Sequence, residues 1–332
     1  MVHTGVPGAQ IVVTEQGRDQ VTTSGVGDLT TGDPFPDNSH VRIASNTKSF
    51  VATVLLELVT EGKLELDAPV DRYLPGVLVG NGNDGTRITV RNLLQHTSGL
   101  PDVYQVLHLL ENLEQVRLQR SETADLVRRT LATPAHFAPG EKFEYSNTNY
   151  LVIGMIIERV TGQSIDEAIT RRIIEPLGLH DTYYPLAGEI GLRNPHPLGY
   201  FEHDGVRIEF TELDPSGAGA SGAMVSTGAD LNRFFIALLG GKLLPPAQLD
   251  EMRRNPVTSD GELPYGLGIE QIPVSCGKAV WGHRGSTPGF VTVGGATTDG
   301  RAVTVMINQL STTTDIEAVA VTALDTAICA IS

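Results

Sequence analysis

Basic residues, long apolar runs and aromatic residues are all scarce in this chain of 332 residues. It has 24 lysines and arginines and 39 aspartates and glutamates, which gives a net charge of −15. An acidic surface repels phosphate backbones and anionic lipid headgroups, so nucleic-acid binding and a membrane-surface role are disfavoured. The best apolar run, over 51–59, contains Glu57 and is much shorter than the roughly 20 residues of a membrane span.

Only two cysteines occur, Cys276 and Cys329. They are either two buried thiols or one disulfide, which would imply an oxidising compartment, and sequence spacing alone does not choose between these. The first residues lack the basic start and apolar middle of a signal peptide, so the chain could be a mature form, a trimmed form or a cytoplasmic protein.

Signals for a metal or another cofactor are also missing. The nine histidines show no H-E-x-x-H pattern and the two cysteines form no C-x-x-C pair, so we expect no catalytic metal. The stretch over 217–222 fits G-x-G-x-x-G, but the polar, proline-containing residues 211–216 before it do not resemble the strand that a dinucleotide site needs. We expect the protein to work without a cofactor.

Strand patterns cluster at the two ends of the chain and helix patterns in its middle. We predict a single α/β domain over 1–332, with an antiparallel sheet flanked by helices. The α/β lobe would comprise about 1–62 and 205–332, and an all-helical lobe would be inserted over about 63–204. The expected strands are 10–14, 20–24, 262–270, 290–296 and 303–308, and the expected helices include 45–62, 90–95, 123–131, 148–161, 165–174 and 315–330.

Ser45 and Lys48 open the helix that the pattern predicts over 45–62. Residues three apart share a helix face, so the Lys48 amine can reach the Ser45 hydroxyl. A serine hydroxyl is a weak nucleophile until a neighbouring base takes its proton, and a helix N-terminus favours an oxyanion. Taken alone, the same residues could be a serine helix cap with a solvated lysine.

Two further motifs follow along the chain. Tyr145-Ser146-Asn147 precedes an apolar helix, and it could supply a proton relay or merely cap that helix. His283-Arg284-Gly285 combines a histidine that could hold a proton with a glycine that would let substrate approach a strand closely, although a lone histidine here could also be a core residue. The order S-x-x-K, Y-S-N and H-x-G is typical of serine acyltransferases that act on penicillin-like substrates.

With these motifs, the chain resembles the class C low-molecular-mass penicillin-binding proteins, especially secreted D-alanyl-D-alanine carboxypeptidases, and the wider class C β-lactamase-related hydrolases. The resemblance runs nearly end to end, and further stretches that support it are 55–64, 96–100, 145–150 and 265–268. It implies a β-lactamase/transpeptidase-like fold, and we interpret 96–100 as a structural turn near the site. It also implies a secreted, monomeric enzyme that accepts small peptides ending in D-amino acids and is acylated by β-lactams.

The resemblance also implies a role for each motif residue. Ser45 would form the acyl-enzyme, Lys48 and Tyr145 would share the acid and base work, and Asn147 would orient the substrate amide. His283 would take the place often held by a lysine. The backbone N–H groups of Ser45 and Ser286 would form the oxyanion hole beside Gly285, and Cys276 and Cys329 would form a disulfide.

Two positions depart from the carboxypeptidase pattern. Glu270 stands where those enzymes hold the substrate carboxylate with an arginine, and Arg284 stands where they carry a small hydroxyl residue. Either Arg284 replaces the lost carboxylate clamp, which we favour slightly, or it pairs with Glu270. The leading interpretation is a D-alanyl-D-alanine carboxypeptidase. The alternatives are a D-amino-acid amidase or aminopeptidase, an esterase or a thioesterase-like peptide cyclase, then a β-lactamase, and last a non-catalytic binding module.

Overall fold

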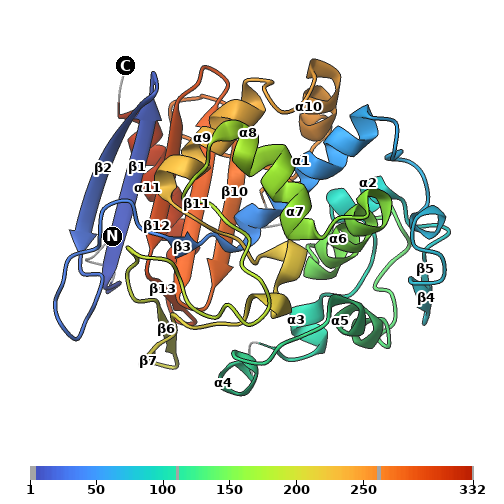
Figure 1. Cartoon of the computed structure of the whole chain (residues 1–332), viewed down its shortest axis with the longest axis horizontal. Helices are drawn as coiled ribbons and strands as arrows, with labels where there is room; N and C mark the ends of the chain where they lie inside the picture. The colour runs from blue at the N-terminus through green and yellow to red at the C-terminus, as the bar shows by residue number, and fades with distance from the viewer. Residues whose placement is uncertain (1–4, 110–111, 260–262, 331–332) are drawn as a thin grey trace.

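The computed structural model describes residues 5–109, 112–259 and 263–330. Its central element is a six-stranded antiparallel sheet in the order β2-β1-β12-β11-β10-β9, shown at one side of the molecule in Figure 1. Both ends of the chain contribute strands because β1 pairs with β12, for example Val12 with Thr304. The strands are β1 (Gly8–Glu15), β2 (Arg18–Gly25), β9 (Glu270–Ile272), β10 (Val280–Thr287), β11 (Phe290–Thr297) and β12 (Ala302–Ile307).

Each face of this sheet is covered by one long helix. Helix α9 (Gly228–Leu239) lies on one face and α11 (Ile316–Cys329) on the other. Side chains alternate between the two faces along a strand, so Met306 joins the core under α9 while Val305 joins the core under α11. The central strands β11 and β12 are therefore buried on both sides, whereas the edge strand β2 is exposed along its whole length.

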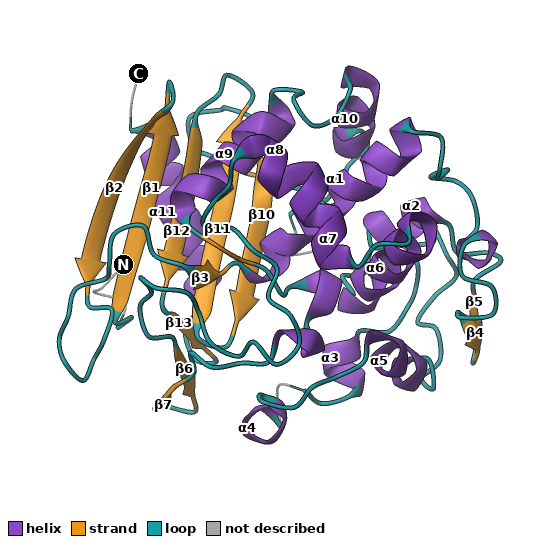
Figure 2. Cartoon of the chain, in the orientation of Figure 1, coloured by secondary structure: helices purple, strands orange, loops and turns teal. Residues whose placement is uncertain are grey.

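Helices fill the side of the molecule away from β2, as Figure 2 shows. Helix α1 (Thr47–Thr60) is almost wholly buried there, and it packs against α6 (Asn147–Thr161) and α7 (Ile165–Ile169). The remaining helices are η2 (Ala44–Asn46), η3 (Val70–Arg72), α2 (Val90–Leu94), α3 (Val103–Val106), α4 (Leu113–Val116), α5 (Thr123–Thr130), η4 (Thr170–Ile174), α8 (Glu175–Leu177), η5 (Pro215–Gly217), η6 (Gly219–Ser221) and α10 (Pro246–Arg253).

Short strand pairs complete the fold. They are β3 (Val41–Arg42) with β8 (Val225–Ser226), β4 (Val79–Gly80) with β5 (Asn83–Asp84), and a three-stranded sheet of β6 (Tyr200–His203), β7 (Val206–Glu209) and β13 (Gln309–Ser311). Within the described ranges, no helix has the length and apolarity to cross a membrane. Cys276 and Cys329 are joined by a disulfide, as the family resemblance implied.

The predicted fold class is confirmed, but one predicted strand is wrong. Residue 262 lies outside the described residues, and 263–269 forms a loop, so β9 begins only at Glu270. The cause is close packing at the glycines. Gly268 has a φ of +80°, and a Cβ placed on it would lie 2.3 Å from the Cβ of Ala52 in α1. A Cβ on Gly266 would likewise lie 2.2 Å from the carbonyl oxygen of Met252 in α10. The alternating glycines therefore allow tight approaches to α1 and α10 and do not mark an extended strand.

Candidate active site

Ser45 lies at the entrance to helix α1, in the 3₁₀ turn η2. The residue before it, Ala44, has a φ of +44°, a conformation that residues other than glycine rarely adopt and that is common at functional sites. Strand β10 passes directly beside this turn. A Cβ placed on Gly285 would lie 2.4 Å from the Ile43 carbonyl oxygen and 3.1 Å from the Ser45 nitrogen, so only glycine fits there.

Lys48 is fully buried, and its amine has three acceptors around it. Its Nζ lies 3.0 Å from the Ser45 Oγ, 2.8 Å from the Asn147 Oδ1 and 2.7 Å from the carbonyl oxygen of Ser221. Burial lowers the pKa of Lys48 to about 7, although the negative charges of Asp102 and Glu270 oppose this shift. A large fraction of the amine is therefore neutral near pH 7 and can accept a proton from Ser45.

Tyr145 faces the same pair of residues. The Lys48 Nζ lies 4.9 Å from the centre of the Tyr145 ring, and the phenol is in hydrogen-bonding contact with the Ser45 side chain. Burial raises the pKa of Tyr145 well above its ordinary value, which outweighs the effect of that hydrogen bond. The phenol thus stays protonated at ordinary pH and is suited to donate its proton.

Asp102 fixes the amide of Asn147, and sequence reasoning did not find it. Its Oδ2 accepts hydrogen bonds from the backbone nitrogen of Asn147 (2.6 Å) and from the Nδ2 of the same residue (2.9 Å). The Asn147 Oδ1 is thereby directed at Lys48. Ser221 was also missed, because it acts through its backbone carbonyl inside the G-x-G-x-x-G stretch, which we rejected as a nucleotide site.

His283 lies beside the site with both ring nitrogens engaged. Its Nε2 lies 2.9 Å from the Tyr265 hydroxyl, and its Nδ1 contacts the carbonyl oxygen of Arg284. Burial lowers the pKa of His283 to about 4, although the charge of Glu270 opposes this, so the imidazole is neutral. Its ring centre is 6.5 Å from that of Tyr145. His283 therefore supports the tyrosines in this structure, and a direct proton transfer with Ser45 has no contact behind it.

Arg284 is bound to Glu270, the second of the two arrangements that the sequence left open. Its Nε lies 3.2 and 3.1 Å from the two carboxylate oxygens of Glu270, and its Nη2 lies 3.0 Å from Oε1. Burial alone would raise the pKa of Glu270, but the nearby charge of Arg284 and the hydrogen bonds from Arg284 hold it below its ordinary value. The pair is therefore ionised.

A second acid contacts the same guanidinium. The Arg284 Nη1 lies 3.4 Å from Glu317 at the start of α11, and Glu317 also accepts a hydrogen bond from the Ser286 hydroxyl. Sequence reasoning did not find Glu317. The two carboxylates surround Arg284, so this end of the site is charged but its cation is already bound within the protein.

Most of these residues line one cleft of about 840 Å³, and Lys48 lies buried behind Ser45. Ser45, Tyr145, Asn147 and Arg284 line it together with Glu317, so the motifs do converge. Part of its wall is apolar and is made by Tyr104, Leu109, Leu113, Val116, Leu213 and Leu310.

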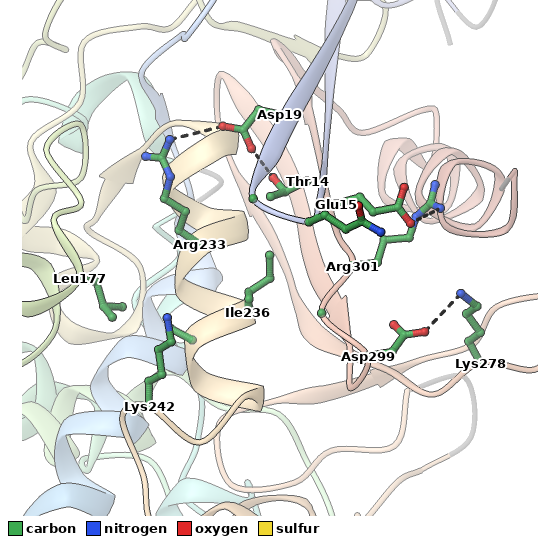
Figure 3. Close-up of a pocket in the computed structure, with 14 residues that line it drawn as sticks. Thr14, Glu15, Asp19, Leu177, Arg233, Ile236, Lys242, Lys278, Asp299 and Arg301 are labelled. Atoms are coloured by element: carbon green, nitrogen blue, oxygen red, sulfur yellow. Dashed lines mark hydrogen bonds and ion pairs between the residues drawn. The ribbon is translucent and has the colours of Figure 1, made fainter. Parts of the chain in front are cut away.

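A second hollow, of about 570 Å³, lies by the β1–β2 turn and α9 (Figure 3). Its basic side chains are mostly paired: Arg233 lies 3.3 Å from Asp19, and Lys278 lies 3.6 Å from Asp299. None of the three sequence motifs reaches it, so we place the chemistry in the first cleft. Across the described residues, His, Cys, Asp and Glu do not gather into a group that could hold a metal ion.

Comparison with known proteins points to one family. Residues 1–327 match the family model described as beta-lactamase. The chain is similar to the crystal structure of a D-stereospecific amidohydrolase from Streptomyces sp., with 34% identity, a TM-score of 0.89, and coverage of 99% of this chain and 95% of that one. It is also similar to the D-amino acid amidase from Ochrobactrum anthropi SV3 complexed with L-phenylalanine amide, with 29% identity, a TM-score of 0.82, and coverage of 98% and 93%.

A curated relative matches over part of its length. Protein flp of Staphylococcus aureus (strain COL) is 31% identical over 180 residues, which cover 54% of this chain and 35% of that protein. The chain therefore matches only about a third of the length of this relative.

Proposed function

The chain belongs to the beta-lactamase family of serine hydrolases, and we propose that it hydrolyses amides of D-amino acids through an acyl-enzyme on Ser45, without needing a free carboxylate on the leaving group. The amidohydrolase and amidase found among the similar structures support this substrate class. The leading expectation of a strict carboxypeptidase therefore gives way to the amidase alternative.

The observation that carries the proposal is the bound state of Arg284. A substrate carboxylate could bind this guanidinium only in competition with Glu270 on Nε and Nη2 and with Glu317 on Nη1. Glu270 is 2% exposed, and it bonds to Arg284 through two nitrogens of the side chain and through the backbone. Leaving a buried carboxylate unpaired costs several kcal/mol, about 3–5 in comparable cases. The amine that leaves from a simple amide carries no carboxylate and does not need Arg284, so an amide substrate suits this end of the cleft better.

Acylation would use the residues around Lys48. The Ser45 Oγ attacks the amide carbonyl carbon while its proton passes to the neutral Lys48 amine. The backbone N–H groups of Ser45 and Ser286 would stabilise the oxyanion. When the C–N bond breaks, the Tyr145 phenol donates its proton to the leaving nitrogen, and Lys48 returns a proton to the phenolate. The amine departs and Ser45 keeps the acyl group.

Deacylation would reverse these roles. Water attacks the ester carbonyl carbon and gives up a proton to Lys48, and the C–O bond to Ser45 breaks. The Ser45 oxygen then regains a proton through the Lys48 and Tyr145 pair. The D-amino acid leaves, its carboxyl group loses its proton to the solvent, and the enzyme returns to its starting state.

A substrate panel tests the proposal. We expect the protein to hydrolyse D-phenylalanine amide well above its rates on L-phenylalanine amide, on acyl-D-Ala-D-Ala and on nitrocefin, each measured by product release. Ser45→Ala should abolish the activity and keep the circular dichroism spectrum, because it removes one half-buried oxygen. A clear preference for acyl-D-Ala-D-Ala over the amide would instead restore the carboxypeptidase interpretation.

A further inference from the structure

His96 lies in the stretch 96–100, which the sequence suggested was only a structural turn. Its side chain is fully buried, and its backbone has a φ of +57°, in the left-handed region that residues other than glycine seldom occupy. Such a conformation persists only where its surroundings hold it, and it is often found at functional sites. The neighbours of His96 are therefore informative.

The backbone on both sides of Tyr145 is bound by His96. The carbonyl oxygen of His96 accepts a hydrogen bond from the nitrogen of Glu144 at 2.9 Å. The Nδ1 of the same residue accepts one from the nitrogen of Ser146 at 3.2 Å. The residues immediately before and after Tyr145 are thus attached to one histidine.

The ring of Tyr145 is bound as well. The imidazole of His96 stacks on the phenol ring with 4.2 Å between ring centres and 28° between the planes. Stacking of this kind restricts the tilt of a ring as well as adding contact energy. Three contacts from His96 therefore set the direction in which the Tyr145 hydroxyl points.

Hydrogen bonding also determines the form of the imidazole. The Nδ1 of His96 faces two donors, the Ser146 nitrogen and the Asn149 Nδ2 at 3.0 Å, and Asn149 is held in this orientation by the Ser98 hydroxyl on its Oδ1. A backbone N–H can only donate, so Nδ1 carries no proton and the ring is neutral with its proton on Nε2. Burial, with the charge of Lys48, holds the pKa of His96 well below its ordinary value, in agreement.

We propose that His96 is a positioning residue that aims the Tyr145 phenol at Ser45 and Lys48, and that proton delivery to the leaving amine depends on it. This inference rests on the proposed function, in which Tyr145 protonates the leaving nitrogen. His96 itself does not touch the reacting atoms; it acts through Tyr145.

Two variants separate the contacts. His96→Phe keeps a ring to stack on Tyr145 but removes the acceptor for Ser146 and is poorly suited to a positive φ. His96→Asn removes the ring but offers an oxygen near the position of Nδ1, and asparagine tolerates the left-handed region best after glycine. A buried nitrogen without an acceptor is expensive, so we expect the phenylalanine variant to be the worse of the two.

The readout is a ratio of two rates measured on the same preparation. A D-amino acyl amide needs its leaving nitrogen protonated, whereas the p-nitrophenyl ester of the same acyl group releases a stable anion. Misplacing a catalytic group by about 1 Å can cost 100-fold, so His96→Phe should lower kcat/KM for the amide about 10- to 100-fold and for the ester less than about threefold. His96→Asn should lower the amide-to-ester ratio about three- to tenfold. Unfolded protein cancels in this ratio, so a loss of stability alone does not change it.

A double variant and a matched control complete the test. Once Tyr145→Phe has removed the hydroxyl, adding His96→Phe should change the ratio little further, because both act on one proton transfer. His40 is also buried (4% exposed) and contacts a tyrosine, with 6.1 Å between its ring centre and that of Tyr183, and neither of these two residues lines the active-site cleft. His40→Asn should therefore leave the ratio unchanged.

The outcomes distinguish this inference from the function on which it rests. If Tyr145→Phe lowers the ratio but neither His96 variant does, the positioning role is overturned and the proposed function stands. If Tyr145→Phe leaves the ratio unchanged, Tyr145 does not protonate the leaving nitrogen, and both the proposed use of Tyr145 and the role of His96 are overturned. An equal fall in His40→Asn would show that the ratio reports general loosening of the fold, and it would also overturn the role of His96.

Discussion

One wall of the cleft is made by the turn η2 that leads into α1, by Asp102 and by the start of α6, and the other by β9, β10 and the start of α11. The first wall holds Lys48, whose pKa is about 7, and Tyr145, which stays neutral. The second holds the ionised pair of Glu270 and Arg284, with Glu317 beside it. The helical wall thus holds the groups that would exchange protons in the proposed function, whereas the sheet wall holds the fixed charges to which we attribute the choice of leaving group.

Removing the amine from the helical wall should have the largest effect. Lys48→Met keeps most of the buried volume but removes the base, so we expect acylation to fall by about 10⁴-fold or more, measured as burst kinetics with the p-nitrophenyl ester. Adding Tyr145→Phe should cost far less than the product of the two single losses. Fully additive losses would mean that the two residues act in separate steps.

The pH profile sharpens the contrast between the walls. Because Lys48 accepts a proton only when neutral, kcat/KM should rise about tenfold per pH unit below about 7 and level off above it. The sheet wall adds no limb near neutrality, since the pKa of His283 is about 4 and that of Glu270 lies below its ordinary value. A limb near pH 7 that persists in the residual activity of Lys48→Met would assign the titration to another group.

Exchanging the charges of the sheet wall should move specificity and leave the chemistry in place. The double variant Glu270→Arg with Arg284→Thr recreates the arrangement of the carboxypeptidases that the chain resembles. A charged hydrogen bond contributes about 1.5–3 kcal/mol, so kcat/KM for acyl-D-Ala-D-Ala should rise roughly 10- to 100-fold relative to the matching amide. If both substrates change by the same factor, this wall does not select the leaving group. Arg284→Thr alone is the control, and it should mainly lower the melting temperature, because Glu270 loses its partner.

The smallest effect on activity is expected from the disulfide. Native protein should show no reactive thiol under denaturing, non-reducing conditions, because Cys276 and Cys329 are joined. Cys276→Ser with Cys329→Ser should change kcat less than about twofold, since neither sulfur lines the cleft, but it should lower the free energy of unfolding by up to about 4 kcal/mol in the chain-entropy model. Urea unfolding monitored by fluorescence measures this. An unchanged unfolding midpoint would show that the bond adds no stability.

The sequence was most informative where chemistry depends on local spacing. Ser45 and Lys48 are three residues apart, and the structure puts their side chains 3.0 Å apart, as a helix start requires. Tyr145 and Gly285 followed from the order of the motifs, and both lie beside Ser45. The strands predicted over 290–296 and 303–308 likewise match the neighbouring strands β11 and β12.

Contacts between distant segments could not be read in the same way. Asp102 and Glu317 gave no sequence signal of their own, because their roles depend on which side chains the fold brings to them. The pairing of Arg284 with Glu270 in β9, 14 residues away, likewise depends on how the two strands are placed. The strand expected over 262–270 was wrong for a similar reason: Gly268 packs against Ala52 in helix α1, and the residues next to Gly268 in sequence do not show this contact.

Strand β10 and helix α11 are connected at both of their ends. The loop before β10 carries Cys276, which is bound to Cys329 at the end of α11. At the other end, Ser286 of β10 bonds to Glu317 in the first turn of α11. The two elements are therefore linked at both ends, by the covalent disulfide at one end and by the hydrogen bond between Ser286 and Glu317 inside the cleft at the other. If one residue were inserted into β10 or α11, the disulfide could not lengthen to accommodate it. The mismatch in length would therefore displace Ser286 from Glu317 in the cleft.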